Sequence, residues 1–145
     1  MTAKEYLRQL WHLDRRINIR LQELERLKAD IGIRQMPNNP DRVTGSGCPQ
    51  DPVSETVIRI KDMEERLDAQ VDRYIHLKAK IMEQIDGMEN QTYQDILTCR
   101  YVLMQNWDDV AESVGYERRY CIKLHGRALQ AFYNLYLKED IERHS

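Results

Sequence analysis

The segment from Glu117 to Arg127 concentrates positive charge in a chain of 145 residues whose formal net charge is −2. Lysine and arginine side chains neutralise phosphates, and a guanidinium group can also donate two parallel hydrogen bonds to guanine. An isoleucine on the same helix could contact a thymine methyl group. We therefore predict that this segment binds DNA through Arg118, Arg119, Ile122, Lys123 and Arg127.

The residues around this segment have the spacing of a DNA-binding helix-turn-helix. From Trp107 to Leu129 the sequence reads W-D-D-V-A-E-S-V-G-Y-E-R-R-Y-C-I-K-L-H-G-R-A-L. Ala111 is small where two helices approach, and Gly115 follows where a tight turn needs a positive φ. Cys121 and Leu124 are the apolar residues that hold the second helix against the first. The pattern predicts a recognition helix at 117–127 in the major groove, with a helical hairpin that only packs as the alternative.

Two long amphipathic helices are predicted ahead of this module, from Ala3 to Ile33 and from Ser54 to about Met88. Apolar residues recur in both at steps of three and four, which is typical of a helix with one buried stripe. The predicted stripes are Leu7, Leu10, Ile17, Leu21, Leu24 and Ile31, then Val57, Ile60, Leu67, Val71, Tyr74, Ile81, Ile85 and Met88. Such helices most simply pair as an antiparallel coiled-coil hairpin. Six apolar residues lie off this seam and indicate a further covered surface: Trp11, Leu13, Met63, Ile75, Leu77 and Met82.

The segment between these helices contains all four prolines and two of the six glycines. Proline removes a backbone donor and glycine adds backbone entropy, so a flexible loop is expected at 35–53. Three further helices are predicted at Gln91–Met104, Trp107–Val114 and Glu117–Leu137, with Asn106 as the N-cap of the middle one. The chain is therefore predicted to be all-α, with a helical hairpin at 1–88 and a tri-helical domain at 89–145.

Other chemistry finds little support in the residue pattern. The three cysteines (Cys48, Cys99 and Cys121) have no C-x-x-C spacing, which indicates reduced thiols and a cytoplasmic protein. We expect no signal peptide and no membrane-spanning helix. The histidines (His12, His76, His125 and His144) lack ligand spacing, and no catalytic triad pattern occurs. We therefore expect no enzyme, no metal and no cofactor.

The C-terminal segment resembles region 4 of bacterial sigma factors over about residues 91 to 135. The matching pieces are L-T-C-R-Y at Leu97–Tyr101, W-D-D-V-A-E-S-V-G at Trp107–Gly115 and R-A-L at Arg127–Leu129. The resemblance implies that the module reads promoter DNA and docks on RNA polymerase. It implies base and phosphate contacts for Arg118 and Lys123, and backbone contacts for Arg119 and Arg127. The whole architecture is also similar to the small RinA- and ArpU-type late-gene activators of Gram-positive phages and prophages.

The sequence departs from the region 4 pattern at three positions. Glu117 stands where serine or threonine usually caps the recognition helix, and Ile122 stands where a polar reader is common. Gly126 lies inside the last helix, at a cost of about 1 kcal/mol relative to alanine. These departures concern the sequence preference of the module more than DNA binding itself.

The leading hypothesis is a sequence-specific transcriptional regulator of phage or prophage genes. It would bind double-stranded DNA, act with RNA polymerase, and form a homodimer or higher homo-oligomer through its N-terminal helices. Two alternatives stay open. One is a helical protein-interaction adaptor, either an anti-activator or a polymerase-binding protein, and the other is the small subunit of a phage DNA-packaging machine.

Overall fold

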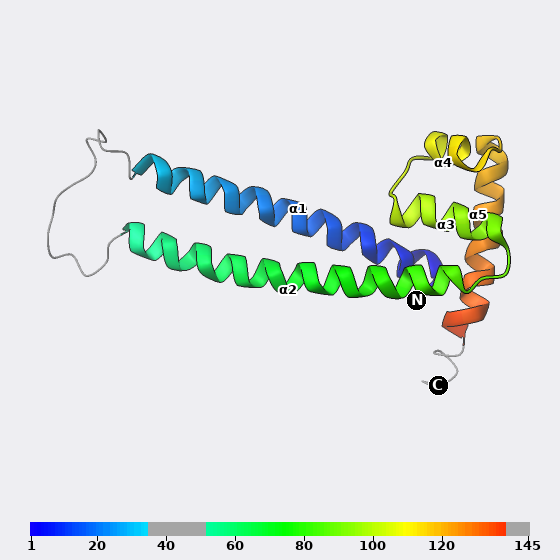
Figure 1. Ribbon diagram of the computed structural model, residues 1–145, viewed down its shortest axis with the longest axis horizontal. Helices are drawn as coiled ribbons and strands as arrows, with labels where there is room; N and C mark the ends of the chain where they lie inside the picture. Colours follow the sequence, from blue (N-terminus) through cyan, green and yellow to red (C-terminus); the bar gives the residue numbers. More distant parts are fainter. Residues whose placement is uncertain (35–51, 139–145) are drawn as a thin grey trace, which may run out of the picture. The chain divides into compact units, whose positions relative to one another are not determined.

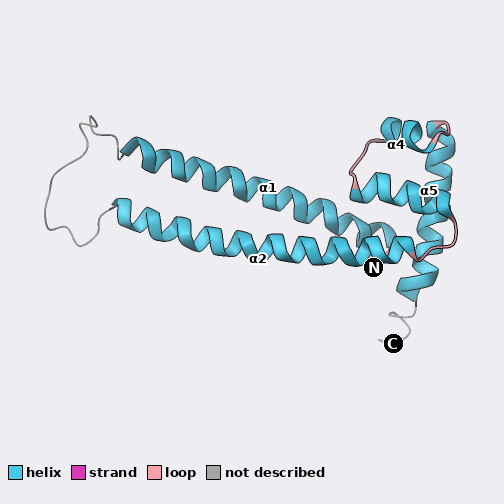
Figure 2. Cartoon of the chain, in the orientation of Figure 1, coloured by secondary structure: helices cyan, strands magenta, loops and turns pink. Residues whose placement is uncertain are grey.

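The described chain consists of helices joined by short turns. The computed structural model describes residues 1–34 and 52–138 (Figure 1). Its helices are α1 (Ala3–Arg34), α2 (Pro52–Asp86), α3 (Gln91–Leu97), α4 (Trp107–Val114) and α5 (Arg118–Phe132). Two π-helical turns, η1 (Thr98–Val102) and η2 (Tyr133–Leu137), continue α3 and α5. Neither described range contains a strand (Figure 2), so the predicted all-α class is confirmed.

Most of the predicted loop at 35–53 lies outside the described residues, and with it Gly45, Gly47 and Cys48. The end of this predicted loop is described and is helical, because α2 begins at Pro52, before the predicted start at Ser54. Proline suits the first turn of a helix because its fixed φ is helical and its missing N–H has no partner there. No helix in the described ranges is long and apolar enough to cross a membrane.

Two of the C-terminal helices have an asparagine as their N-cap residue. The Asp109 N–H donates a hydrogen bond of 2.9 Å to Asn106 Oδ1, so the predicted N-cap of α4 is confirmed. At the start of α3, the Tyr93 N–H donates to Asn90 Oδ1 at 3.2 Å. Each cap satisfies a backbone donor that has no partner inside its helix.

The chain divides into two compact units. One contains Met1–Asp14 and Tyr74–Ser145, and the other contains Arg15–Arg73. This division does not coincide with the predicted boundary between residues 88 and 89. The reason is a shared core: the first turns of α1 and the last turns of α2 pack with the C-terminal helices, through Leu7, Leu10, Ile81, Ile85, Leu97, Tyr101, Ala128 and Phe132.

A hydrogen bond and an aromatic contact also hold the ends of the long helices against this core. The Tyr6 hydroxyl of α1 donates a hydrogen bond of 2.8 Å to Gln84 Oε1 of α2. The Tyr6 ring also lies against Phe132 of α5, with ring centroids 5.8 Å apart. Of the residues predicted to need a further cover, Trp11 and Leu77 pack against the core, whereas Ile75 and Met82 are 55% and 42% exposed. The C-terminal helices thus complete a core that begins at the N-terminus.

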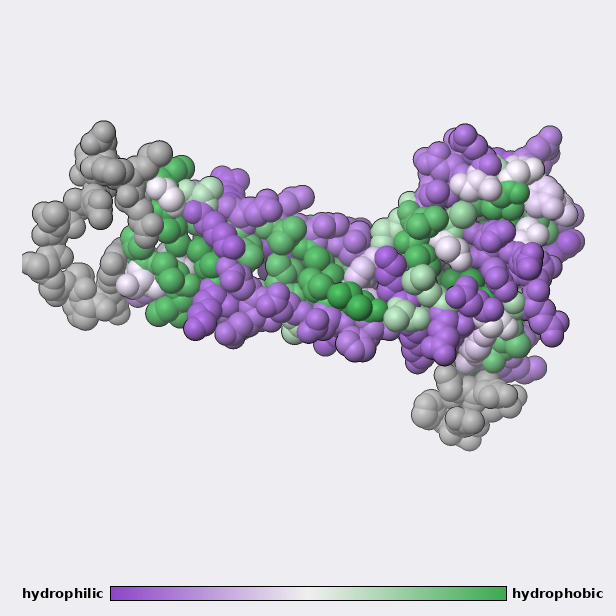
Figure 3. Space-filling view, in the orientation of Figure 1, coloured by the Kyte–Doolittle hydropathy of each residue, from purple (hydrophilic) through white to green (hydrophobic). Residues whose placement is uncertain are grey.

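The second unit has a thinner core. Leu24 of α1 and Leu67 of α2 are buried, and Lys28 Nζ lies 3.0 Å from Glu64 Oε1. The prediction of burial is wrong for Leu21 and Val57, which are 41% and 48% exposed. The described residues of this unit form only two helix segments, and none of them adds a third layer over these side chains. Figure 3 accordingly shows apolar surface on this part of α1 and α2. The coiled-coil register itself stays a prediction.

Truncation of one core leucine tests whether α1 belongs to the C-terminal core. Leu10 is fully buried, so Leu10→Ala should lower the free energy of unfolding of that unit by about 3 kcal/mol. The exposed Leu21 is the control, and Leu21→Ala should cost less than about 1 kcal/mol. Urea unfolding followed by tryptophan fluorescence reports on this unit, because Trp11 and Trp107, the only tryptophans of the sequence, both belong to it. An unchanged transition in Leu10→Ala would refute the shared core.

Candidate nucleic-acid interface

The turn between α4 and α5 depends on one left-handed residue. Gly115 has φ 84° and ψ 21°, and its N–H donates a hydrogen bond of 2.9 Å to the Ala111 carbonyl. A Cβ at Gly115 would meet no atom within 4 Å, so the glycine is needed for its conformation and not for space. Two residues later, Glu117 has extended backbone and precedes α5 without a side-chain cap hydrogen bond. The chain thus reverses between two helices within a few residues.

The inner face of this helix pair is apolar. Val110 of α4 and Cys121 of α5 are fully buried, Leu124 is 6% exposed, and Ala111 is half-buried. Cys121 and Cys99 are buried free thiols, while Cys48 lies outside the described residues. Burial of this face holds α5 in a defined rotation, so its opposite face points to solvent.

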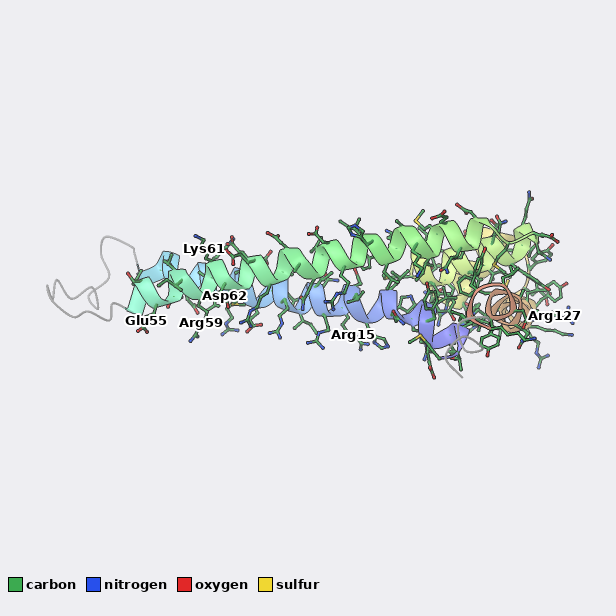
Figure 4. The ribbon with its side chains drawn as sticks, turned by 90° about the horizontal axis from the view of Figure 1, so that it is seen from below. Arg15, Glu55, Arg59, Lys61, Asp62 and Arg127 are labelled. Atoms are coloured by element: carbon green, nitrogen blue, oxygen red, sulfur yellow. The ribbon has the colours of Figure 1, made fainter. Side chains whose placement is uncertain are left out.

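The outer face of α5 carries one continuous stripe of predicted DNA-binding residues. Steps of three and four residues place four of them on one side of the helix, and all are exposed: Arg119, Ile122, Lys123 and Arg127, here called the α5 stripe. Figure 4 shows Arg127 pointing away from the neighbouring helices. No carboxylate among the described residues forms an ion pair with the three cations of the stripe. Their charge is therefore available to a partner.

Arg118 is arranged differently from the stripe. Its Nη1 atom lies 3.6 Å from Asp108 Oδ1 of α4, and both side chains are more than half exposed. An ion pair at this exposure contributes little stability. Asp108, Asp109 and Glu112 are all exposed, so α4 presents an acidic surface beside the basic one on α5. Arg118 lies where the two surfaces meet.

A cluster of aromatic and cationic side chains supports the helix pair, and the sequence pattern did not predict it. The Arg100 guanidinium of η1 lies over two indole rings, 4.9 Å from the centroid of Trp11 and 4.7 Å from that of Trp107. Its Nη1 donates a hydrogen bond of 2.9 Å to the Gln105 carbonyl. Trp11 also stacks on Tyr101, with centroids 5.1 Å apart. The cluster thereby joins the start of α1 to η1 and α4.

His125 is the polar residue at the base of this cluster. Its Nε2 shares a hydrogen bond of 2.7 Å with the Tyr101 hydroxyl. The His125 ring also packs edge-to-face against the Trp107 ring, with ring centroids 4.8 Å apart. Burial, followed by the nearby cations Arg100, Lys4 and Arg8, lowers the pKa of His125 to about 4. Burial raises the pKa of Tyr101 to about 12. At neutral pH the imidazole is therefore uncharged and the phenol protonated.

Sequence spacing did not bring these residues together because they come from segments far apart in the chain. Trp11 belongs to the N-terminal helix, and its position off the predicted seam was the one available signal. The exposed pair Tyr116 and Tyr120, with ring centroids 5.2 Å apart at the turn, was also missed. Aromatic residues inside a helical pattern indicate core packing, and only the fold reveals which of them face solvent.

Comparisons with protein-family models, curated proteins and solved structures find no match for the chain. In the part of the chain that the structure describes, no three histidine, cysteine or acidic side chains gather where they could hold a metal ion. The positive helix face and the aromatic cluster behind it are therefore the features from which function must be argued.

A pair of glycine substitutions tests the turn. Gly115→Ala should lower the free energy of unfolding by about 1 kcal/mol, because alanine resists a positive φ. Gly126 lies within α5, where an added Cβ would also meet nothing within 4 Å. Gly126→Ala should therefore raise stability by up to about 1 kcal/mol. Urea unfolding at neutral pH measures both, and equal effects of the two substitutions would contradict the assigned turn.

The lowered pKa of His125 predicts acid sensitivity. Its value of about 4 lies below the ordinary 6.5, so between these pH values the unfolded chain binds a proton that the folded chain does not. Stability from this group is complete above pH 6.5 and falls as the pH falls. The loss between pH 7 and pH 5 should be about 2 kcal/mol.

His125→Gln should remove this part of the pH dependence, even if it lowers stability at every pH. Urea unfolding at the two pH values measures the effect. If His125→Gln lost as much stability on acidification as the wild type, His125 would not be the titrating group.

Proposed function

We propose that this protein is a sequence-specific DNA-binding transcriptional regulator of phage or prophage genes, with α5 in the major groove of double-stranded DNA. The observation that carries the proposal is the α5 stripe. Three exposed cations without described carboxylate partners lie on one face of a helix whose rotation is set by a buried opposite face. An α-helix is narrow enough to enter the major groove, and cations on its outer face meet phosphates and base edges.

The composition of the stripe supports both sequence-independent and sequence-dependent contacts. Arg119, Lys123 and Arg127 neutralise phosphates or read guanine, while Ile122, 43% exposed, contacts thymine methyl groups. Tyr116 and Tyr120, exposed at the turn, carry hydroxyls that add donors for phosphate oxygens. Because an isoleucine cannot hydrogen-bond to a base, we infer that thymine is favoured at the position it contacts.

Asp108 gives the module an orientation on DNA. In the free protein its carboxylate faces Arg118, and this exposed pair is easily broken. Phosphate repels the acids of α4 and attracts the cations of α5, so DNA approaches from the α5 side. Arg118 exchanges Asp108 for a phosphate or a base when the module binds. The acidic surface of α4 then remains free for RNA polymerase.

Oligomerisation is part of the proposal because one small module buries limited DNA surface. Two linked modules would gain affinity through effective concentration. The exposed apolar residues of the second unit, including Ile19, Ile33 and Ile58, support a homodimer or higher homo-oligomer through the N-terminal helices. The setting would be the cytoplasm of a bacterial host cell.

A protein-interaction adaptor is the second candidate, and the exposed acids Asp108, Asp109 and Glu112 favour it. Both functions use the same helix pair, but they differ in their response to salt. Affinity for DNA falls steeply with rising salt, since each phosphate contact releases counterions. A protein interface of apolar and mixed character depends on salt far less.

The double substitution Arg119→Ala with Lys123→Ala tests the reading face. Removing two phosphate-contacting cations should weaken duplex binding more than tenfold and reduce the slope of log affinity against log salt by about 2. Fluorescence anisotropy with a labelled duplex from the DNA beside the gene measures both quantities. The matched control is Arg59→Ala with Lys61→Ala, which removes the same charge from exposed residues of α2 (Figure 4). If both double variants bound DNA like the wild type, α5 would not be the reading helix.

A further inference from the structure

A cleft of about 240 Å³ lies beside the α5 stripe, within the unit that contains Met1–Asp14 and Tyr74–Ser145. Its walls come from the start of α1, from η1, from the start of α4 and from α5, and they include Lys4, Arg8, Arg100 and Ile122. A cleft of this size holds several water molecules, so it has room for a phosphate group. Ile122 belongs both to this wall and to the α5 stripe.

The cleft is strongly electropositive. Lys4, Arg8 and Arg100 line it, and no described residue that lines it carries a carboxylate. None of the three forms an ion pair with a described acid. Their combined effect reaches the base of the cleft, where all three lower the pKa of His125 after burial itself. Three unneutralised cations around one concave site repel one another unless an anion joins them.

Two hydrogen-bond donors at this site have no acceptor. Arg8 Nε and Trp11 Nε1 are shielded from water and make no hydrogen bond with any described residue. A buried donor without a partner costs about 1–3 kcal/mol. Arg100 differs, because its Nη1 donates to a backbone carbonyl and its guanidinium lies over two indole rings. An acceptor near Arg8 and Trp11 would therefore satisfy two donors that are unpaired among the described residues.

We propose that this cleft is a phosphate-binding site, with Arg8, Lys4 and Arg100 supplying the positive charge and Trp11 Nε1 a neutral donor. A phosphate group offers several acceptor oxygens and negative charge, which match the unpaired donors and the unneutralised cations together. The phosphate comes either from the DNA backbone beside the α5 stripe or from a free phosphate or phosphomonoester. The DNA source rests on the proposed function, whereas the affinity of the cleft for phosphate does not.

Intrinsic fluorescence reports directly on this site because Trp11 and Trp107 both line it and are the only tryptophans. Titration of the full chain with inorganic phosphate should change the fluorescence saturably, while sodium chloride of equal ionic strength should not. Arg8→Gln should raise the midpoint about tenfold, which corresponds to about 1.4 kcal/mol. Lys4→Gln should raise it several-fold. Arg16→Gln, an exposed cation on α1 outside the cleft, should respond as the wild type does.

A duplex titration distinguishes the two phosphate sources. If the DNA backbone is the source, the duplex should cause the same fluorescence change, free phosphate should compete with it, and Arg8→Gln should weaken duplex binding about tenfold. If the source is a free phosphate, Arg8→Gln should bind duplex like the wild type. In that case Arg119→Ala with Lys123→Ala should keep the full phosphate response. Phosphate binding without any duplex binding would contradict the proposed function but leave this site standing.

The site is refuted if neither phosphate nor duplex changes the fluorescence of the folded wild-type chain. It is also refuted if Arg8→Gln and Lys4→Gln respond to phosphate as the wild type does. Circular dichroism confirms that each variant keeps its helix content. Lys4 is exposed and outside the apolar core, so Lys4→Gln provides a folded variant even if Arg8→Gln proves unstable.

Discussion

The guanidinium of Arg100 lies over the indole rings of both Trp11 and Trp107, and the arrangement of the C-terminal unit depends on this contact. A cation over an aromatic face is attracted by the ring's charge distribution, and more strongly where water is partly excluded. Because the two rings come from α1 and α4, and Arg100 comes from η1, one side chain connects three segments. The apolar core beneath them includes Leu10 and Phe132. Together these contacts set the position of α5 relative to the start of the chain.

The local distribution of charge matters more in this protein than its net charge of −2. Acids on α4 are close to cations on α5, and Arg118 and Asp108 form the border between them. The cations of the α5 stripe and of the cleft lack carboxylate partners among the described residues, although the chain as a whole is acidic. Cations left unneutralised in this way favour an anionic partner, which is the basis of the DNA-binding function that we propose.

The two units bury their apolar residues to different degrees for a geometric reason. Where the helix ends meet α3, η1 and α5, side chains such as Leu7 and Ile85 are fully enclosed. Among the described residues of the unit at 15–73, two helix segments bury only Leu24 and Leu67. A stripe inferred from spacing is therefore buried only where a further layer exists. For this reason the pattern was correct at Leu7 and wrong at Leu21.

Local signals were enough to determine the all-α class, the start of α1, the bounds of α4, the cap at Asn106 and the glycine of the turn. These features depend on backbone propensity and on neighbours a few residues away. The sequence also identified the cations at 117–127 as a group. Only the tertiary structure separated Arg118 from the stripe, put His125 in the core, and brought Lys4, Arg8 and Arg100 around one cleft. Those relations join segments far apart in the chain, and packing, not periodicity, decides which of them meet.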